Sequence, residues 1–316
     1  MTTALITHQA ALEHVTPYGH PERVARIERL VAEFNAPEFA CLMRIEAQMA
    51  EESAILRAHP EAYLNALRTK IPQQGFAAID ADTYLSAGSW KAIMRAAGGA
   101  VQGVDLVMAG KAHNAFCMMR PPGHHAERMQ AMGFCFLDNV VIAAKHALDH
   151  HGLQRVAILD FDVHHGNGTQ DLVWDDARIA FCSSHEMPLY PGSGRVDERG
   201  AHNNILNIPL AAGTDGRMFR AKMEQLALPF LAAHEPELIL ISAGFDAHSL
   251  DPLANLNLDG ADFGWITQKA CELAAKTAHG RVVSVLEGGY DLDGLAEGAL
   301  AHMRALMTSG MESGNG

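Results

Sequence analysis

The chain has 316 residues, and 48% of them are hydrophobic, enough to bury a substantial core. Its 37 acidic residues against 24 basic ones give a net charge of −13, which argues against binding to nucleic acid and suits a cationic substrate. The 5 cysteines are scattered, with no C-x-x-C pair, which fits a reducing compartment. No signal peptide or membrane span is evident, so we expect a cytoplasmic protein.

Short apolar runs alternate with longer helical patterns, which is typical of a mainly parallel sheet covered by helices on both faces. We predict strands over 113–119, 155–162, 179–184, 205–210, 237–245 and 281–289. We predict helices over 89–110, 139–152, 216–234 and 262–280. No linker or repeat divides the chain, so we expect one α/β domain over residues 1–306, followed by a disordered tail over 307–316.

The stretch ILDFDVHHGNGT (158–169) carries the strongest chemical signal. Asp160, Asp162 and His164 alternate along a predicted strand, so their side chains are expected on one face. Crowded carboxylates on an apolar strand are unfavourable unless a cation meets them, which favours a bound metal. The motif alone leaves two alternatives open: the Asp-x-Asp of glycosyltransferases, and acidic residues that cap the next helix.

Polar motifs follow five predicted strands, at the edge where open parallel sheets bind ligands. They are RPPGHHA (120–126), DFDVHHGNGT (160–169), SSHEMPLYPGSG (183–194), GFDAHSLDP (244–252) and EGGYD (287–291). A catalytic zinc site has three protein ligands and one open position, for which Asp162, His164 and Asp246 are candidates. Asp251 and Asp259 are alternatives for the third ligand, but they lie further into the loop.

Two imidazoles beside a metal-activated water can divide the work of proton transfer, one accepting a proton while the other stays charged. His124 and His125 in RPPGHHA fit these roles, and Tyr290, after two glycines, can donate a hydrogen bond to an oxyanion. Adjacent histidines also occur as plain surface residues, which is how we interpret His150 and His151 at a helix end. Tyr290 could equally be an aromatic plug in a glycine loop.

RPPGHHA, GFCFLDN (133–139), DFDVHHGNGT, GFDAHSLDP and EGGYD together resemble, in order, the motifs of the zinc-dependent histone deacetylase family, which includes bacterial acetylpolyamine amidohydrolases. The resemblance extends from HPERVARIERL (20–30) to about residue 300. It implies an arginase/deacetylase-like three-layer α/β/α sandwich around a mainly parallel sheet of about eight strands. It also implies one zinc ion per chain and a potassium ion.

The resemblance makes Asp162, His164 and Asp246 the zinc ligands and His125 the general base. The partner of His125 falls at Asn167, where one branch of the family has Asp and the class II-like branch has Asn. A weaker imidazole base is expected from an amide partner than from a carboxylate, so the pH profile should differ between the branches.

By the same resemblance, His124 is the electrostatic and proton-donating companion of His125, and Asp160 holds it in place. Tyr290 is the oxyanion donor, and Arg26 in HPERVAR matches an arginine deep behind the metal. The potassium site would comprise Asp160, Asp162, His164, Ser183 and Ser184.

Gly133 and Phe134 match one wall of the family's substrate channel, and Tyr190 occupies the opposite aromatic position. Two aromatic faces would hold a narrow aliphatic chain such as a lysine stem. Leu253 stands where a polyamine-selective eukaryotic branch has an acidic residue, which weakly favours acyl-lysine or a neutral substrate. The segments 8–22 and 185–199 and the region around Asp82 are expected to shape the pocket mouth.

We therefore predict a zinc-dependent deacetylase that removes an acetyl or related acyl group from a primary amine, such as acyl-lysine, through attack by metal-activated water. An acetylpolyamine amidohydrolase is the alternative. An arginase-like enzyme with two manganese ions needs further ligands that we do not find. A non-catalytic module that binds acylated ligands should have lost a ligand, the His pair or the Tyr. The sequence leaves the physiological substrate, the acyl length and homo-oligomer formation open.

Overall fold

The computed structural model describes residues 2–312 and is built on an 8-stranded sheet. The strand order is β2-β1-β5-β10-β9-β6-β7-β8, and all of these neighbours pair in parallel. The strands are β1 (Thr3–Thr7), β2 (Met43–Glu46), β5 (Asn114–Cys117), β6 (Val156–Asp160), β7 (Ile179–Glu186), β8 (Ile205–Leu210), β9 (Leu238–Ala243) and β10 (Val282–Leu286). The predicted α/β fold with a parallel sheet is confirmed.

Five of the predicted strands are buried along their whole length, because parallel strands covered on both faces are continuous apolar runs. Two strands of the sheet, β1 and β2, were not predicted. Strand β2 alternates between half-buried and exposed residues at the edge of the sheet, so it carries no such run. A separate antiparallel hairpin of β3 (Phe76–Ala78) and β4 (Tyr84–Ser86) was also missed.

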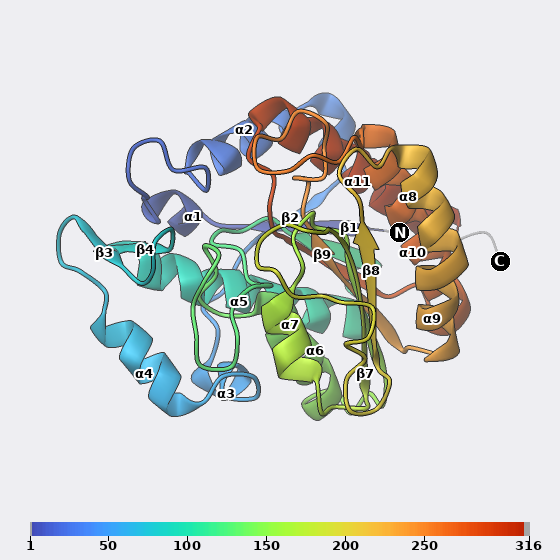
Figure 1. Cartoon of the computed structure of the whole chain (residues 1–316), viewed down its shortest axis with the longest axis horizontal. Helices are drawn as coiled ribbons and strands as arrows, with labels where there is room; N and C mark the ends of the chain where they lie inside the picture. Colours follow the sequence, from blue (N-terminus) through green and yellow to red (C-terminus); the bar gives the residue numbers. More distant parts are fainter. Residues whose placement is uncertain (1, 313–316) are drawn as a thin grey trace.

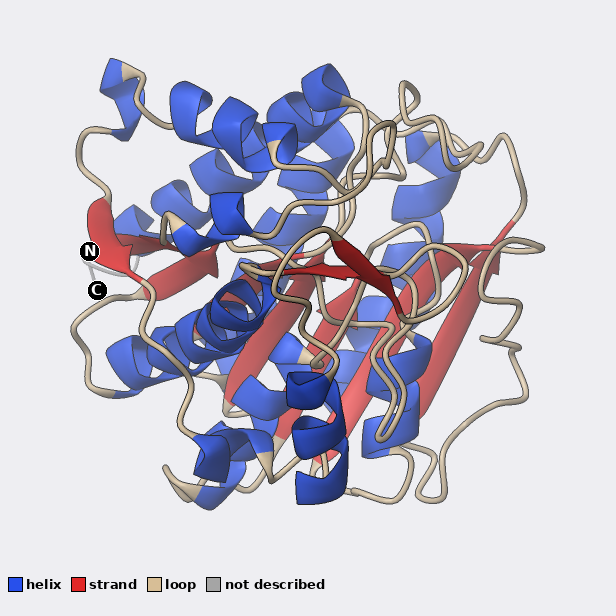
Figure 2. Cartoon of the chain, turned by 90° about the vertical axis from the view of Figure 1, so that its left-hand side faces the viewer, coloured by secondary structure: helices blue, strands red, loops and turns tan. Residues whose placement is uncertain are grey.

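Helices cover both faces of the sheet and make the outer layers (Figure 1, Figure 2). One layer contains α5 (Ser89–Met108), α6 (Asn139–Asp149) and α7 (Asn167–Val173). The other contains α2 (Ala25–Glu33), α8 (Gly216–Lys222), α9 (Leu228–Ala233), α10 (Gly260–Thr277) and α11 (Leu292–Glu312). Shorter helices are α1 (Ala10–Glu13), α3 (Glu52–Ile55) and α4 (Glu61–Thr69).

Side-chain caps explain where two of the predicted helices begin. Asp138 accepts a hydrogen bond from the Val141 N–H at the start of α6, and Asp259 forms a capping box with Asp262 at the start of α10. The predicted helix over 216–234 is continuous, but a π-helical turn over Met223–Ala227 separates α8 from α9.

Helix α11 extends beyond the predicted domain end at residue 306. It continues to Glu312, so residues 307–312, which we expected to be disordered, are helical. The buried Met303 and Leu306 anchor this helix, and Asn114 Nδ2 donates to the Leu306 carbonyl oxygen (2.8 Å). The remainder of the expected tail, 313–316, lies outside the described residues.

The strand order explains why the polar motifs meet. Strands β5, β10, β9, β6 and β7 are consecutive neighbours in the sheet, and each of the five motifs begins at the end of one of them or shortly after it. Because parallel strands end at the same edge, the loops that carry these motifs share one rim. The fold therefore places the candidate site at the carboxyl ends of the central strands.

Candidate active site and metal centre

Three buried side chains at this rim form a group that can hold a metal ion. Asp162, His164 and Asp246 each offer a ligand atom, and these atoms lie within 4.8 Å of one another. His164 Nδ1 is 3.0 Å from Asp246 Oδ2 and 3.2 Å from Asp162 Oδ1. The predicted ligand set is thus brought together, and two carboxylates with one imidazole are a donor set that suits zinc.

The backbone after β6 positions two of these ligands. The strand ends at Asp160, two residues earlier than predicted, so strict alternation does not place Asp162 and His164. Instead, the Asp162 N–H donates to Asp160 Oδ1 (3.1 Å) and the His164 N–H donates to Asp162 Oδ1 (2.9 Å). Short aspartate side chains that accept from the backbone two residues ahead turn the chain tightly. The sequence predicted that Asp162 and His164 lie together, but a turn brings them together and not the alternation of a strand.

Neighbouring loops fix the two carboxylates. Asp246 Oδ1 accepts from the Val163 N–H (2.8 Å), and Asp162 Oδ2 accepts from the Gly288 N–H (2.8 Å). A side chain at Gly288 would not fit, since its Cβ would lie 2.2 Å from Asp246 Oδ2 and 2.6 Å from Asp162 Oδ2. The glycines of EGGYD therefore allow the backbone to approach the metal group.

The electrostatics of this group favour a cation. Burial, with the nearby charge of Asp162, raises the pKa of Asp246 to about 7. Burial also disfavours the charged form of Asp162, but the charges of His124 and His164 hold its pKa below the usual range. A divalent ion would neutralise the paired carboxylates at this buried position.

The two alternative third ligands have other roles. Asp251 Oδ2 accepts from the backbone N–H groups of Tyr290 (2.7 Å) and Asp291 (3.3 Å), so it orients the loop that carries the tyrosine. Asp259 caps helix α10. Neither belongs to the metal-binding group.

Two histidines lie beside the metal group with different partners. His124 Nδ1 is 3.0 Å from Asp160 Oδ2, whereas His125 Nδ1 is 2.7 Å from the amide oxygen of Asn167. The two ring centroids are 4.1 Å apart. Because Asn167 Oδ1 accepts a hydrogen bond, Nδ1 of His125 carries the proton and its Nε2 keeps a lone pair.

These partners separate the two pKa values. Burial lowers the pKa of His124, but the charges of Asp162 and Asp160 outweigh it and hold that pKa well above its ordinary value. Burial and the charges of His124 and His164 hold the pKa of His125 well below its ordinary value. Around neutral pH, one imidazole is therefore charged and its neighbour is neutral.

A cavity of about 550 Å³ leads to these groups. Its lining comprises Pro17, Tyr18, Gly19, His20, Pro21, Ala81, Asp82, Tyr84, His125, Gly133, Phe134, His164, Leu189, Tyr190, Leu253 and Tyr290. The predicted wall residues are all present, and the three segments expected at the mouth each contribute. One metal ligand, one of the paired histidines and Tyr290 thus face the same cavity.

The wall residues pack closely around His125. The Tyr190 ring meets the His125 ring edge to face, with centroids 5.2 Å apart. Gly133 has φ 54°, and a Cβ there would lie 2.5 Å from the His125 ring. Phe134 also has a positive φ, and its N–H donates to Thr83 Oγ1 (3.2 Å). This geometry explains why the wall has a glycine at position 133.

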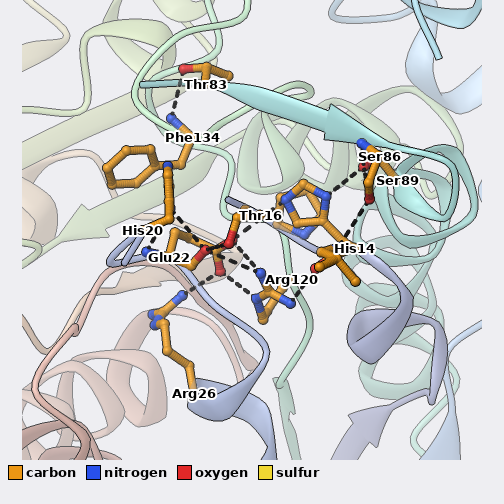
Figure 3. A network of polar contacts seen from close by, with 12 residues as sticks. His14, Thr16, His20, Glu22, Arg26, Thr83, Ser86, Ser89, Arg120 and Phe134 are labelled. Carbon is orange, nitrogen blue, oxygen red and sulfur yellow. Dashed lines mark hydrogen bonds and ion pairs between the residues drawn. The ribbon is translucent and has the colours of Figure 1, made fainter. Parts of the chain in front are cut away.

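A buried ionic network supports the cavity from behind (Figure 3). Glu22 lies between two guanidinium groups, because Arg120 donates to both of its carboxylate oxygens (2.5 Å each) and Arg26 to one (3.1 Å). Arg26 also donates to the Gly289 carbonyl oxygen (2.6 Å) and lies 5.0 Å from the centre of the Tyr290 ring. Arg26 thus holds the loop that carries Tyr290.

Sequence reasoning missed several members of this support. Glu22 and Arg120 were not singled out, and neither was Glu287, which accepts from the backbone N–H groups of Gly123 (2.7 Å) and His124 (3.2 Å). His20, whose ring meets Phe134 edge to face at 4.8 Å, was also missed. All four residues lie inside the motifs quoted in the sequence analysis, and this membership is the signal that could have identified them.

Potassium was expected at Asp160, Asp162, His164, Ser183 and Ser184. Asp160 and Ser183 are partners in the β6–β7 register. Ser184 Oγ is buried and has no hydrogen-bond partner among the described residues. Such an atom fits a nearby cation, although it would also be satisfied by water.

Within the described part of the chain, no helix is both long and apolar enough to cross a membrane.

Comparison with known proteins agrees with this geometry. A probable deacetylase of Archaeoglobus fulgidus is 36% identical, covering 93% of this chain and 83% of the relative. Histone deacetylase 14, chloroplastic, of Arabidopsis thaliana is 37% identical, and the match covers 94% of this chain and 75% of that relative. The crystal structure of the HDA15 HD domain superposes with a TM-score of 0.92 at 29% identity, over 99% of this chain and 92% of that one, and shares the arginase/deacetylase fold. The family model described as the histone deacetylase domain matches residues 20–306, and the chain belongs to this family.

Proposed function

We propose that this chain is a zinc-dependent deacetylase that hydrolyses the amide bond between an acyl group and a primary amine, with residues 1–306 as its catalytic domain. The observation that carries the proposal is the meeting of Asp162, His164 and Asp246 beside the paired histidines at a cavity. When bound there, zinc would act as a Lewis acid toward the amide carbonyl and water.

The side chains around the cavity divide the remaining steps. His125 Nε2, with its lone pair, accepts a proton from the attacking water. His124, kept charged beside Asp160, stabilises the developing negative charge and gives its proton to the leaving amine. Tyr290 donates its hydroxyl proton in a hydrogen bond to the developing oxyanion. The products are a carboxylic acid and a free amine.

The channel wall supports an extended acyl-amine substrate. Phe134 and Tyr190 line the cavity and would contact the aliphatic stem of an acyl-lysine. Leu253 at the lining offers no charge to a second ammonium group, which favours acyl-lysine over an acylpolyamine. Asp82 at the same cavity favours the opposite choice, so an acylpolyamine remains the second candidate substrate.

We also propose a potassium ion at Asp160, Asp162, His164, Ser183 and Ser184. The unpartnered Ser184 hydroxyl and the adjoining buried carboxylates support a cation there. It would lie beside the loop that carries two zinc ligands, so its expected effect is to stiffen that loop.

The scattered cysteines support a reducing compartment, and we propose that this protein is located in the cytoplasm.

The proposed function is tested by measuring release of acetate. The purified, zinc-loaded protein is incubated with an acetyl-lysine peptide, acetylputrescine and longer acyl-lysines, each with and without a hydroxamate. We expect acetate release from at least one acetylated amine, inhibition by the hydroxamate, and loss of activity after chelation that zinc restores. A zinc-loaded protein that is inert toward all these amides would contradict the proposal.

Replacing Asn167 with Asp is expected to move the acidic limb of the kcat/KM profile to higher pH, by about 1–3 units. A carboxylate 2.7 Å from Nδ1 favours the charged imidazole and raises the pKa of His125. Since the base must be neutral, activity then disappears at a higher pH than in the wild type. The measurement is kcat/KM between pH 5 and 9.

Glu127 provides the control for this variant. Asn167 Nδ2 donates to Glu127 Oε1 (2.8 Å), so Asn167→Asp also places two carboxylates together. Glu127→Gln alone should leave the profile in place, and the double variant should still show the shift. An unmoved acidic limb in Asn167→Asp would mean that His125 is not the titrating base.

A further inference from the structure

A second group of potential metal ligands lies away from the catalytic rim, between α5 and α6. Asp105 comes from α5, His146 from α6, and His150 and His151 from the turn where α6 ends. One ligand atom from each of these four residues lies within 4.8 Å of the others. His150 is exposed and His151 is half-buried, as expected of a surface pair, but the packing of α6 on α5 brings Asp105 and His146 beside them.

The histidines converge on one carboxylate. His146 Nε2 lies 2.8 Å and His151 Nε2 2.7 Å from the same oxygen of Asp105, Oδ1. The rings of His146 and His150 are stacked, with centroids 4.6 Å apart. These two residues are four apart on one helical face, the spacing with which helices present two histidines to one zinc ion.

Hydrogen bonding within the cluster is incomplete. His146 is 7% exposed, and its Nδ1 is buried with no hydrogen-bond partner among the described residues. A buried polar atom without a partner is unfavourable and calls for an unseen water, because Nδ1 lies on the other side of the ring from the Nε2 that faces Asp105. The cluster borders a cavity of about 200 Å³, which Asp105, His146 and His150 help to line. An ion can therefore reach it together with a water molecule.

The local charge also suits a cation. Partial burial raises the pKa of Asp105, but hydrogen bonds to His146 and His151 outweigh it and lower that pKa, so the side chain is a carboxylate at neutral pH. The Asp105 carboxylate therefore places a negative charge among the three imidazoles. Glu51 and Arg57 also line the cavity, and their opposite charges balance.

We propose that Asp105, His146, His150 and His151 form a second site for a divalent transition metal, with Zn²⁺ as the expected ion. Imidazoles with one carboxylate suit zinc and its neighbours rather than calcium or magnesium. Tetrahedral bonds of about 2.0–2.1 Å separate ligand atoms by about 3.4 Å, so Asp105 Oδ1 and the two imidazole nitrogens need to move apart by only about 0.6 Å.

This ion would be structural, because it lies far from the reacting groups. Helix α6 begins beside the catalytic rim and ends at the opposite edge of the sheet, just before β6 starts. Its 11 residues span about 16 Å. The ion would join the ends of α5 and α6, and the inference does not depend on the proposed reaction.

The test is the zinc content of the untagged chain. Protein saturated with zinc and freed of excess metal is analysed by mass spectrometry for zinc per chain. We expect two zinc ions in the wild type, one in His150→Ala/His151→Ala with deacetylase activity retained, and one in Asp246→Ala with activity lost. His202→Ala/His234→Ala, which removes two histidines outside both groups, should keep two.

Thermal unfolding gives a second measurement. Added zinc should raise the Tm of the Asp246→Ala protein and fail to raise it in Asp246→Ala/His150→Ala/His151→Ala. One zinc in the wild type, unchanged by His150→Ala/His151→Ala, would show that the cluster is only a hydrogen-bond network and overturn the proposal. Two zinc ions in that double variant would place the second ion elsewhere and overturn it as well.

Discussion

Replacing Tyr290 with Phe is expected to lower kcat for deacetylation by about 10²–10³-fold, with little change in KM. The hydroxyl is proposed to donate a hydrogen bond to an oxyanion that exists only as the carbonyl is attacked, so its loss raises the barrier and leaves substrate binding intact. The tyrosine is 7% exposed and faces the cavity. Steady-state kinetics on an acetyl-lysine peptide provide the measurement.

The contacts that hold the Tyr290 loop in place do not involve the tyrosine hydroxyl, so the substitution removes the hydroxyl alone. Asp251 accepts from the Tyr290 backbone N–H, and Arg26 donates to the neighbouring Gly289 carbonyl oxygen. None of these contacts uses the hydroxyl, so Phe should keep the loop in place. Tyr84→Phe is the matched control, because Tyr84 lines the same cavity and its hydroxyl donates to the Ala81 carbonyl oxygen (3.1 Å).

The two tyrosine variants should differ clearly in kcat. Tyr84→Phe should keep kcat near the wild-type value, and both variants should keep their zinc content. If Tyr290→Phe were as active as Tyr84→Phe, the tyrosine would be an aromatic plug in its glycine loop, which is the alternative that the sequence left open.

The metal group is the part of the site that sequence reasoning predicted best. Asp162, His164 and Asp246 follow strands whose apolar runs are unambiguous, and neighbouring parallel strands must end at one rim. The position of Asp246 directly after its strand favoured it over Asp251, which lies further into the loop, and the family resemblance implied the same choice. A turn after Asp160, and not the predicted strand alternation, places Asp162 and His164, but the three side chains meet as predicted.

The parts that were missed depend on packing between segments far apart in the sequence. Glu22 lies inside the quoted HPERVARIERL motif, but its role becomes clear only when the fold buries it between Arg26 and Arg120. Long-range contacts of this kind leave no local periodicity, and a buried ion pair is visible only in three dimensions.

The histidine cluster between α5 and α6, which comprises Asp105, His146, His150 and His151, also depends on packing that the sequence does not show. His146 and His150 share a helical face, which the sequence displays, yet Asp105 lies on a different helix. Only the packing of α5 against α6 brings its carboxylate to the imidazoles. The histidines at the end of α6 therefore looked like ordinary surface residues, because the sequence does not show that Asp105 lies beside them.

Replacing His125 with Ala is expected to lower kcat by about 10²–10⁴-fold, the range for a lost general base. Of the two adjacent imidazoles, His125 is the one that lines the cavity and has its pKa held low by burial and by the charges of His124 and His164, so it alone can accept a proton at neutral pH. Activity is measured together with zinc content and hydroxamate affinity, which should both survive.

His124→Ala distinguishes the roles of the pair. The charge on His124, held by Asp160, is proposed to serve the leaving amine, so this variant should lose more rate on amide substrates than on an activated ester, whose leaving group needs no proton. His125→Ala should lose rate on both substrates, because both need an activated water. If His125→Ala stayed active on the ester while His124→Ala lost it, the assignments would be reversed, and the carboxylate-bound imidazole would be the base.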